Sequence, residues 1–225
     1  MTMSEPSLPD ASVLEADAPR RASRTRARSL LAIHRAAIKV FARDGFNGAS
    51  TQAIADAAGL SKAQLHYYID SKEHLYRATL QDIVDDWIAV FGFADAQHGP
   101  TKVLAGYIRR KMVFSFEQPE RSRIFTAEMM RGGAALRPLM GASKRRTEQA
   151  VAVIRAWIDA GQIAPVDPLL LLFHIWAVTQ HYADYADQIA FFRGPSGHTA
   201  PDREYLIAEA TAFVLRGAGV AEPAP

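Results

Sequence analysis

The fold of this chain is decided by two short segments that follow one another, TQAIADAA at residues 51–58 and LSKAQLHY at residues 60–67. Small alanines and apolar residues at helical spacing predict a pair of short helices that pack closely. Ile54 and Leu65 supply the apolar contact between them. Gly59 takes the turn, where a Cβ atom would clash.

The ends of these two helices carry polar side chains suited to nucleic acid. Ser50 or Thr51 can cap the first helix, and Ser61 can cap the second, which leaves amide donors near a phosphate. The arrangement resembles a helix-turn-helix, a motif in which the second helix enters the major groove of DNA. A glutamine can pair with adenine, and a lysine with guanine or phosphate. The side chains expected to face the groove are Lys62, Gln64, His66 and Tyr67. Plain packing in a helical bundle is the alternative.

Positive charge is concentrated in one block of the chain. Residues 20–77 carry 11 Lys and Arg against 4 Asp and Glu, although the whole chain has a net charge of only +2. Residues 1–19 carry four acids and no base, and residues 78–225 are nearly neutral. The basic block is suited to a polyanion such as double-stranded DNA, and a solvated basic face is the alternative.

Apolar residues recur at helical spacing along the remaining chain, and no run of alternating strands interrupts them. We therefore predict an all-α fold of about nine helices, the first at 25–44 and the most apolar at 169–189. Three parts follow from this pattern: a disordered arm, acidic then basic, at 1–24; a three-helix helix-turn-helix domain at 25–75; and a larger helical domain at 76–220.

Composition and motifs exclude several classes of protein. The chain has no Cys, which excludes a disulfide scaffold and thiol catalysis and fits a reducing cytoplasm. The N-terminus lacks the layout of a signal peptide, and no apolar stretch is long enough for a membrane. No nucleotide-binding loop, nucleophile elbow or zinc-protease motif occurs. We expect no enzyme activity, no cofactor and no metal, because no carboxylate joins His174 and His181 at ligand spacing.

A longer block resembles a known family. Residues 37–80, AIKVFARDGFNGASTQAIADAAGLSKAQLHYYIDSKEHLYRATL, resemble the N-terminal domain of the TetR family of transcriptional regulators throughout, with His66 in place of the usual Tyr. The resemblance implies that Thr51 and Gln52 face the DNA backbone, and that Tyr68 and Lys72 hold phosphates. The leading Arg run of the first helix either reaches an adjacent groove or backbone, or is simply a solvated arm.

The same resemblance implies a role for the larger domain. In the TetR family this part forms a homodimer and holds a small ligand in a helical cavity. The segments IAPVDP at 163–168 and HIWAVTQHYADY at 174–185 resemble one branch, the regulators of pyrimidine utilisation, which respond to uracil or thymine. The implied function is a repressor released by such a pyrimidine. The alternative is a TetR-type repressor of an efflux or catabolic operon that senses a larger apolar molecule.

The candidate effector site lies on the helix predicted at 169–189. At 100° per residue, Trp176 and Gln180 share an inward face, and His174, His181 and Tyr185 share the opposite face, which is suited to a partner subunit. A lone Gln on an apolar face needs hydrogen-bond partners, which a flat imide ring can supply. Trp176 can stack on such a ring and Trp87 can form a second wall. Lys111 belongs either to this site or to a polar network, and core packing is the alternative for both tryptophans.

Overall fold

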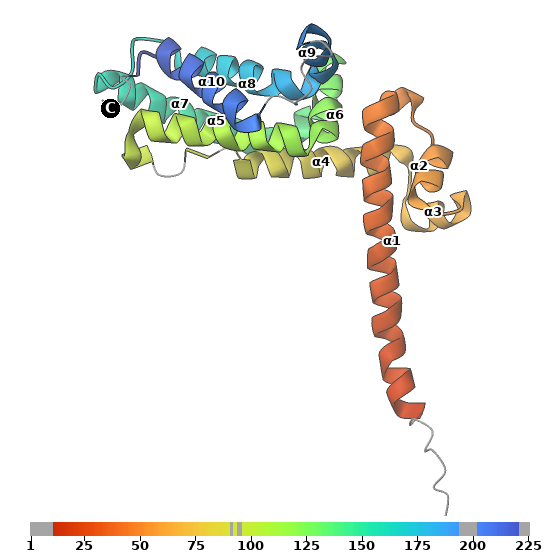
Figure 1. The fold of residues 1–225 in the computed structure, drawn as a ribbon. Helices are drawn as coiled ribbons and strands as arrows, with labels where there is room; N and C mark the ends of the chain where they lie inside the picture. The colour runs from red at the N-terminus through yellow and green to blue at the C-terminus, as the bar shows by residue number, and fades with distance from the viewer. Residues whose placement is uncertain (1–10, 91, 94–95, 194–201, 221–225) are drawn as a thin grey trace, which may run out of the picture. The chain divides into compact units, whose positions relative to one another are not determined.

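The computed structural model describes residues 11–220 apart from 91, 94–95 and 194–201 (Figure 1). Within that part of the chain the structure consists of ten α-helices and two short 3-10 helices, with no strand. The predicted all-α class is confirmed, with one helix more than the approximate number expected. Residues 1–10, the first part of the arm predicted to be disordered, lie outside the described residues.

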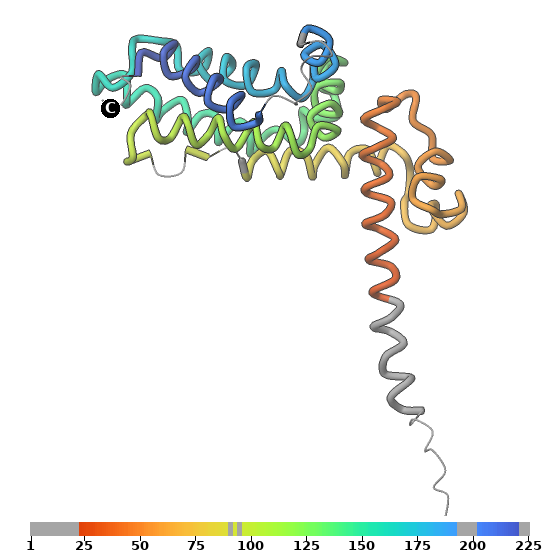
Figure 2. Tube along the Cα trace, in the orientation of Figure 1, coloured from red at the N-terminus to blue at the C-terminus, as the bar shows by residue number. Residues whose placement is uncertain are grey.

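The chain divides into two compact units, Met1–Tyr76 and Arg77–Pro225. The first unit contains α1 (Ala11–Gly48), α2 (Thr51–Ala58) and α3 (Lys62–Tyr68), and α4 (Lys72–Val90) continues from the first unit into the second. Figure 2 traces the same path as a tube.

The first helix begins earlier than the sequence predicted. α1 starts at Ala11 instead of residue 25, so the second half of the predicted arm is helical. Residues 20–28 consist mainly of Arg and Ala, which rank high in helix propensity, and these residues allow the helix to extend backwards. At its other end Gly45 adopts φ 65°, a left-handed conformation that interrupts the helix where the sequence predicted its stop. The buried face of α1 comprises Ile33, Ala36, Ala37, Val40 and Phe41.

The second unit is a bundle of six further α-helices. Their bounds are Gly99–Glu117 for α5, Pro119–Met130 for α6, Gly141–Asp159 for α7, Pro168–Asp184 for α8, Ala186–Arg193 for α9 and Arg203–Gly217 for α10. The 3-10 helices are η1 (Ala96–His98) and η2 (Arg137–Leu139). At the start of α8, Asp167 accepts hydrogen bonds from the amides of Leu169 and Leu170, at 2.8 and 3.0 Å.

The single helix predicted at 169–189 is wrong, because the structure has two helices there, α8 and α9. The break falls at Tyr185, which caps α8 with φ −117° and ψ 31°. The break lies next to a polar contact between α6 and α8. The carboxylate of Asp184 accepts hydrogen bonds from the hydroxyls of Ser122 and Thr126 on α6, at 3.1 and 2.8 Å.

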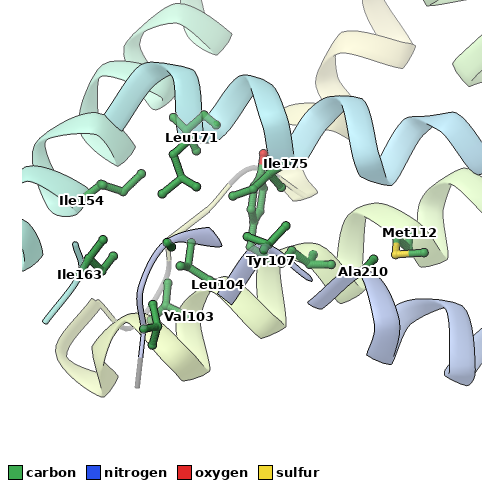
Figure 3. Close-up of a cluster of buried hydrophobic side chains, with 14 of the residues drawn as sticks. Val103, Leu104, Tyr107, Met112, Ile154, Ile163, Leu171, Ile175 and Ala210 are labelled. Atoms are coloured by element: carbon green, nitrogen blue, oxygen red, sulfur yellow. The ribbon is translucent and has the colours of Figure 1, made fainter. Parts of the chain in front are cut away.

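The core of the second unit lies where α5 meets α8 and α10. Figure 3 shows Leu104 and Tyr107 of α5 next to Ile175 of α8, with Ile154 and Ala210 contributed by α7 and α10. Burial of these apolar side chains is the dominant favourable contribution to folding. It fixes α5 and α8 side by side, and both helices carry candidate effector residues.

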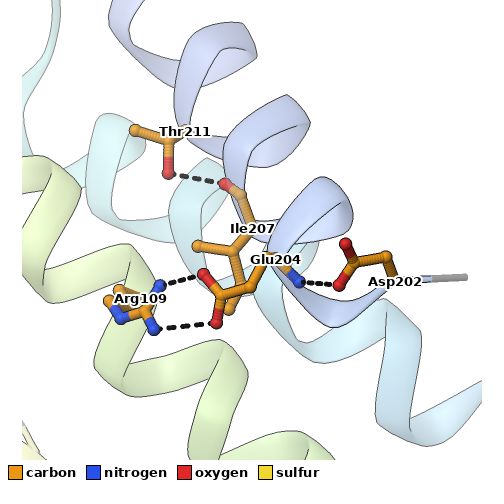
Figure 4. A network of polar contacts seen from close by, with 5 residues as sticks. All are labelled: Arg109, Asp202, Glu204, Ile207 and Thr211. Atoms are coloured by element: carbon orange, nitrogen blue, oxygen red, sulfur yellow. Dashed lines mark hydrogen bonds and ion pairs between the residues drawn. The ribbon is translucent and has the colours of Figure 1, made fainter.

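A polar network reinforces the packing of α10 on α5 (Figure 4). The guanidinium of Arg109 donates two hydrogen bonds to the carboxylate of Glu204, one of 2.8 Å, and this pairing holds the pKa of Glu204 below its usual value. Asp202 caps α10 by accepting from the amide of Glu204 at 3.0 Å. A pocket of about 500 Å³ lies beside this ion pair and is lined by Ala105, Gly106 and Ala208.

Candidate DNA-binding and effector sites

The two short helices of the first unit have the geometry predicted for a helix-turn-helix. Ser50 caps α2, since its hydroxyl accepts a 3.0 Å hydrogen bond from the amide of Ala53. Gly59 adopts φ 69° and ψ 31°, and the chain turns sharply into α3. Ile54 and Leu65 are fully buried, as the sequence predicted.

The second helix of this pair, α3, is called the reading helix here because it is the one expected to enter the DNA groove. The side chains predicted to face the groove are exposed to solvent. Lys62, Gln64 and His66 are exposed, and Tyr67 is 72% exposed. Gln64 also has a structural role that the sequence analysis missed. Its amide oxygen accepts a 2.8 Å hydrogen bond from the backbone of Ser61, whose hydroxyl accepts one of 3.2 Å from the amide of Gln64. This capping box leaves the NH₂ of Gln64 as its natural donor toward a base.

Two tyrosines and an arginine gather at the C-terminal end of α3. The rings of Tyr67 and Tyr68 meet edge to face, with centroids 5.1 Å apart. The guanidinium of Arg26, from α1, lies 5.8 Å from the centroid of each ring. Tyr68 is half-buried, whereas Tyr67 is exposed. The cation therefore links the N-terminal part of α1 to the reading helix.

The remaining predicted DNA contacts lie at the ends of α2 and α4. Gln52 is exposed and donates a 2.8 Å hydrogen bond to Asp56, and Thr51 is half-buried at the first position of α2. Lys72, which the family resemblance implies to be a phosphate ligand, also has partners inside the first unit. Its ammonium donates to the backbone carbonyls of Phe46 and Ala49, both at 2.9 Å, and lies 4.6 Å from the centroid of the Phe46 ring.

In the second unit, two of the four predicted effector residues are in direct contact. The ammonium of Lys111 lies 4.1 Å from the centroid of the Trp87 ring. Trp87 stacks on Phe125 of α6, with ring centroids 4.7 Å apart and an interplanar angle of 19°. Burial lowers the pKa of Lys111 to about 7, although the charge of Asp184 opposes this shift. The Trp87 ring is therefore in contact with both the Phe125 ring and the ammonium of Lys111.

Gln180 belongs to a polar chain between α6 and α8. Its amide nitrogen donates a 2.6 Å hydrogen bond to the hydroxyl of Thr126, which donates onward to Asp184. Thr126 and Asp184 thereby join the candidate effector residues, and neither is predicted from the sequence. Their spacing in the sequence gives no signal, because 58 positions separate them and only the packing of α6 on α8 brings them together.

The fourth candidate effector residue, Trp176, has different partners from Trp87, Lys111 and Gln180. Its indole N–H donates a 2.7 Å hydrogen bond to the phenol of Tyr107, whose pKa is raised by burial. Trp176 also packs beside Phe173, with ring centroids 5.2 Å apart. Both rings line a pocket of about 600 Å³ between α7 and α8, together with Val151 and Leu169. The structure thus gives Trp176 a place in the core and on this pocket.

The opposite face of α8, which the sequence predicts to meet a partner subunit, is exposed in the single chain. His174, His181 and Tyr185 are exposed, and the last two stack at 4.8 Å. Among the described residues no group of three or more His, Asp or Glu is arranged to hold a metal ion. No described helix is both long enough and apolar enough to cross a membrane.

Comparison with known proteins places the chain in a family. Residues 33–79 match the model described as bacterial regulatory proteins of the tetR family, and residues 80–221 match that of the YcdC-like protein C-terminal region. The chain belongs to the TetR family. It is therefore a ligand-responsive DNA-binding regulator of transcription and not an enzyme.

Two individual transcriptional regulators are similar to this chain in sequence. The chain is 41% identical over 164 residues to the HTH-type transcriptional regulator RutR of Escherichia coli K12, an alignment that covers 72% of this chain and 77% of that protein. It is 29% identical over 135 residues to the HTH-type transcriptional repressor NicS of Pseudomonas putida, covering 58% of this chain and 61% of that one.

Solved structures share the fold. A tetR-family regulator from Rhodococcus RHA1 superposes with a TM-score of 0.70 at 20% identity, covering 86% of this chain and 98% of that chain. AibR in complex with isovaleryl coenzyme A and operator DNA superposes with a TM-score of 0.64 at 17% identity, covering 83% and 97%.

Proposed function

We propose that this protein is a repressor that a uracil-like pyrimidine releases from its operator. The observation that carries the proposal is the Lys111–Trp87 contact beside the Gln180 chain. A pyrimidine imide is flat and offers both N–H donors and carbonyl acceptors. The Trp87 ring matches its faces, while the amide oxygen of Gln180 and the ammonium of Lys111 match its edges. The resemblance to the regulators of pyrimidine utilisation supports the same effector.

The position of Trp87 also connects ligand binding to the affinity for DNA. Trp87 is on α4, the helix that continues from the DNA-binding unit into the second unit. A ligand that displaces Trp87 acts directly on that helix. Coupling between two sites in a regulator is typically about 1–3 kcal/mol, which corresponds to roughly 5–150-fold in DNA affinity.

Calorimetric titration of the full-length protein with uracil, thymine and adenine tests the effector. We expect uracil or thymine to bind and adenine to bind at least about tenfold more weakly, a difference of about 1.4 kcal/mol. Gln180→Leu keeps the volume of the side chain and removes its hydrogen-bonding groups, so it should abolish binding. Gln149→Leu makes the same change at an exposed position of α7 and should leave binding intact. Failure of both pyrimidines to bind contradicts the proposal.

The pocket between α7 and α8 favours a second candidate effector. It has a volume of about 600 Å³ and aromatic and aliphatic walls, with Lys144 and Arg155 in its lining. Glu148 and Asp167 in the same lining balance these two cations, so the composition suits a larger, mainly apolar molecule. Binding of an aliphatic carboxylate such as decanoate, lost in Trp176→Ala and retained in Gln180→Leu, supports this candidate over the pyrimidine.

We further propose a homodimer formed through the open face of α8. Leu170, Phe173 and Tyr185 are 51%, 44% and 53% exposed, and Tyr205 and Phe213 of α10 are 54% and 62% exposed. An apolar face of this kind marks an interaction site, and a twofold dimer would read a pseudo-palindromic operator. Sedimentation of the wild-type protein should give twice the chain mass, and Phe173→Glu should give a monomer.

A further inference from the structure

Apart from Arg26, the N-terminal part of α1 carries positive charge that neither site described above uses. From Ala18 to Arg43 the sequence contains eight Lys and Arg and no Asp or Glu. Five of these cations precede Ile33, the first buried side chain of the helix among those described: Arg20, Arg21, Arg24, Arg26 and Arg28.

This part of the helix has no core to hold it. Between Ser23 and Ala32 every side chain is exposed or half-buried. At 1.5 Å per residue, Arg24 lies about 14 Å along the helix axis from Ile33. Figure 1 shows α1 running on past α2 and α3 toward its N-terminus. An isolated helix of this length is only marginally stable in water, so a bound partner would stabilise it.

One contact connects this segment to the reading helix. Arg26 lies 5.8 Å from the ring centroids of both Tyr67 and Tyr68, at the C-terminal end of α3. The segment Arg24–Arg28 therefore lies beside the helix whose other side chains face the DNA groove. Arg24 and Arg28 are four residues apart, so they share a face of α1, and both are exposed. This face lies about 160° around the helix from Arg26, so α3 does not cover it.

We propose that Arg24 and Arg28 of α1 bind the phosphate backbone of double-stranded DNA beside the groove that α3 enters. Arg26 positions the segment through the two tyrosines, and the two outer arginines neutralise phosphates. Guanidinium groups are suited to this task, because their donors match phosphate oxygens in a bidentate geometry. Such contacts carry no base specificity and add to the affinity for every sequence.

Since the contacts are independent of sequence, they are measurable on a duplex of arbitrary sequence. The experiment uses the full-length protein and fluorescence anisotropy between about 50 and 200 mM salt. Each phosphate contact contributes about 0.9 to the slope of log affinity against log salt. Replacing both residues, Arg24→Gln with Arg28→Gln, should therefore reduce the slope by about 1.8.

The same helix offers a matched control. Arg35 and Lys39 are exposed, repeat the four-residue spacing and lie on the part of α1 that packs through its other face. Arg35→Gln with Lys39→Gln removes the same charge and should leave the slope unchanged. The conservative pair Arg24→Lys with Arg28→Lys keeps the charge and should retain the wild-type slope.

Three results overturn the proposal. Equal loss of slope in both Gln pairs shows that only net charge matters. An unchanged slope for Arg24→Gln with Arg28→Gln shows that these residues make no phosphate contact. Loss of slope in the Lys pair assigns the effect to altered structure instead of to charge.

Discussion

The ammonium of Lys111 lies 4.1 Å from the centroid of the Trp87 ring, and Lys111 is only 5% exposed. Burial disfavours the charged form of a lysine, which is why its pKa falls to about 7 from the usual 10.5. Asp184 opposes the shift without cancelling it. Near pH 7 the Lys111 side chain is therefore present both as the ammonium over the Trp87 ring and as the neutral amine.

This balance predicts a pH dependence of stability. Between pH 7 and 10.5 the unfolded chain holds a proton on Lys111 that the folded chain has released, so the free energy of unfolding should rise with pH across that window. The maximal slope from one such group is about 1.4 kcal/mol per pH unit. Urea unfolding of the wild-type protein and of Lys111→Met at pH 7, 8 and 9 measures it. A stability difference between them that stays constant with pH contradicts the burial of Lys111.

Lys72 should act on stability as well as on DNA. Its two carbonyl acceptors, at Phe46 and Ala49, lose a charge-assisted donor in Lys72→Met. We expect a loss of about 1–3 kcal/mol in the unfolding free energy of the DNA-binding unit. Thermal unfolding followed by circular dichroism measures this. Unchanged stability together with a flatter salt dependence of DNA binding would show that Lys72 acts only as a phosphate ligand.

Gln64 has two roles that substitutions can separate: its amide oxygen caps α3, and its NH₂ group is the proposed donor to a base. Gln64→Glu keeps an oxygen that accepts from the amide of Ser61 but removes the NH₂ donor toward bases, so it should preserve stability and weaken DNA binding. Gln64→Ala removes both groups and should also cost about 1 kcal/mol of stability. Chemical denaturation alongside gel-shift titration compares the variants. Equal stability loss in both would show that the capping oxygen is not what Gln64 contributes.

Gly219 should not tolerate a side chain. Its φ is 63°, and an added Cβ would lie 2.6 Å from the Cβ of Ala164. Gly219→Ala should cost about 1–3 kcal/mol. Gly217→Ala, at a position where a Cβ meets nothing within 4 Å, is the matched control and should leave the melting temperature unchanged or raise it. Equal melting temperatures for the two variants contradict the close approach of the chain at Ala164.

The DNA-binding unit was largely predictable because its signals are local. Gly59, Ser61 and the apolar pair Ile54 and Leu65 lie within twelve residues, and the structure uses Ser61, Ile54 and Leu65 as the sequence predicted. Gly59 makes the predicted turn for another reason, because an added Cβ would meet nothing within 4 Å and the left-handed φ of 69° is what favours glycine. The second role of Gln64 was also within reach, since Ser followed three residues later by Gln is the pattern of a capping box.

The effector region was less predictable because its contacts join distant segments. The hydroxyl of Thr126 meets Gln180 and Asp184 only when α6 packs on α8. Helical periodicity showed that Trp176 faces inward, but it could not show that the indole N–H is directed at Tyr107. The break at Tyr185 has no Gly or Pro to signal it, and the tie that accompanies it, from Asp184 to α6, is a tertiary contact.

The central claim is that a pyrimidine bound in the second unit weakens DNA binding by the first. Its most direct test is the affinity of the full-length protein for the DNA upstream of its own gene, measured by anisotropy with and without saturating uracil. The account predicts that uracil lowers this affinity roughly 5–150-fold in the wild-type protein, and leaves that of Gln180→Leu unchanged. An equal affinity with and without uracil in the wild-type protein, or an equal response in Gln180→Leu, would contradict it.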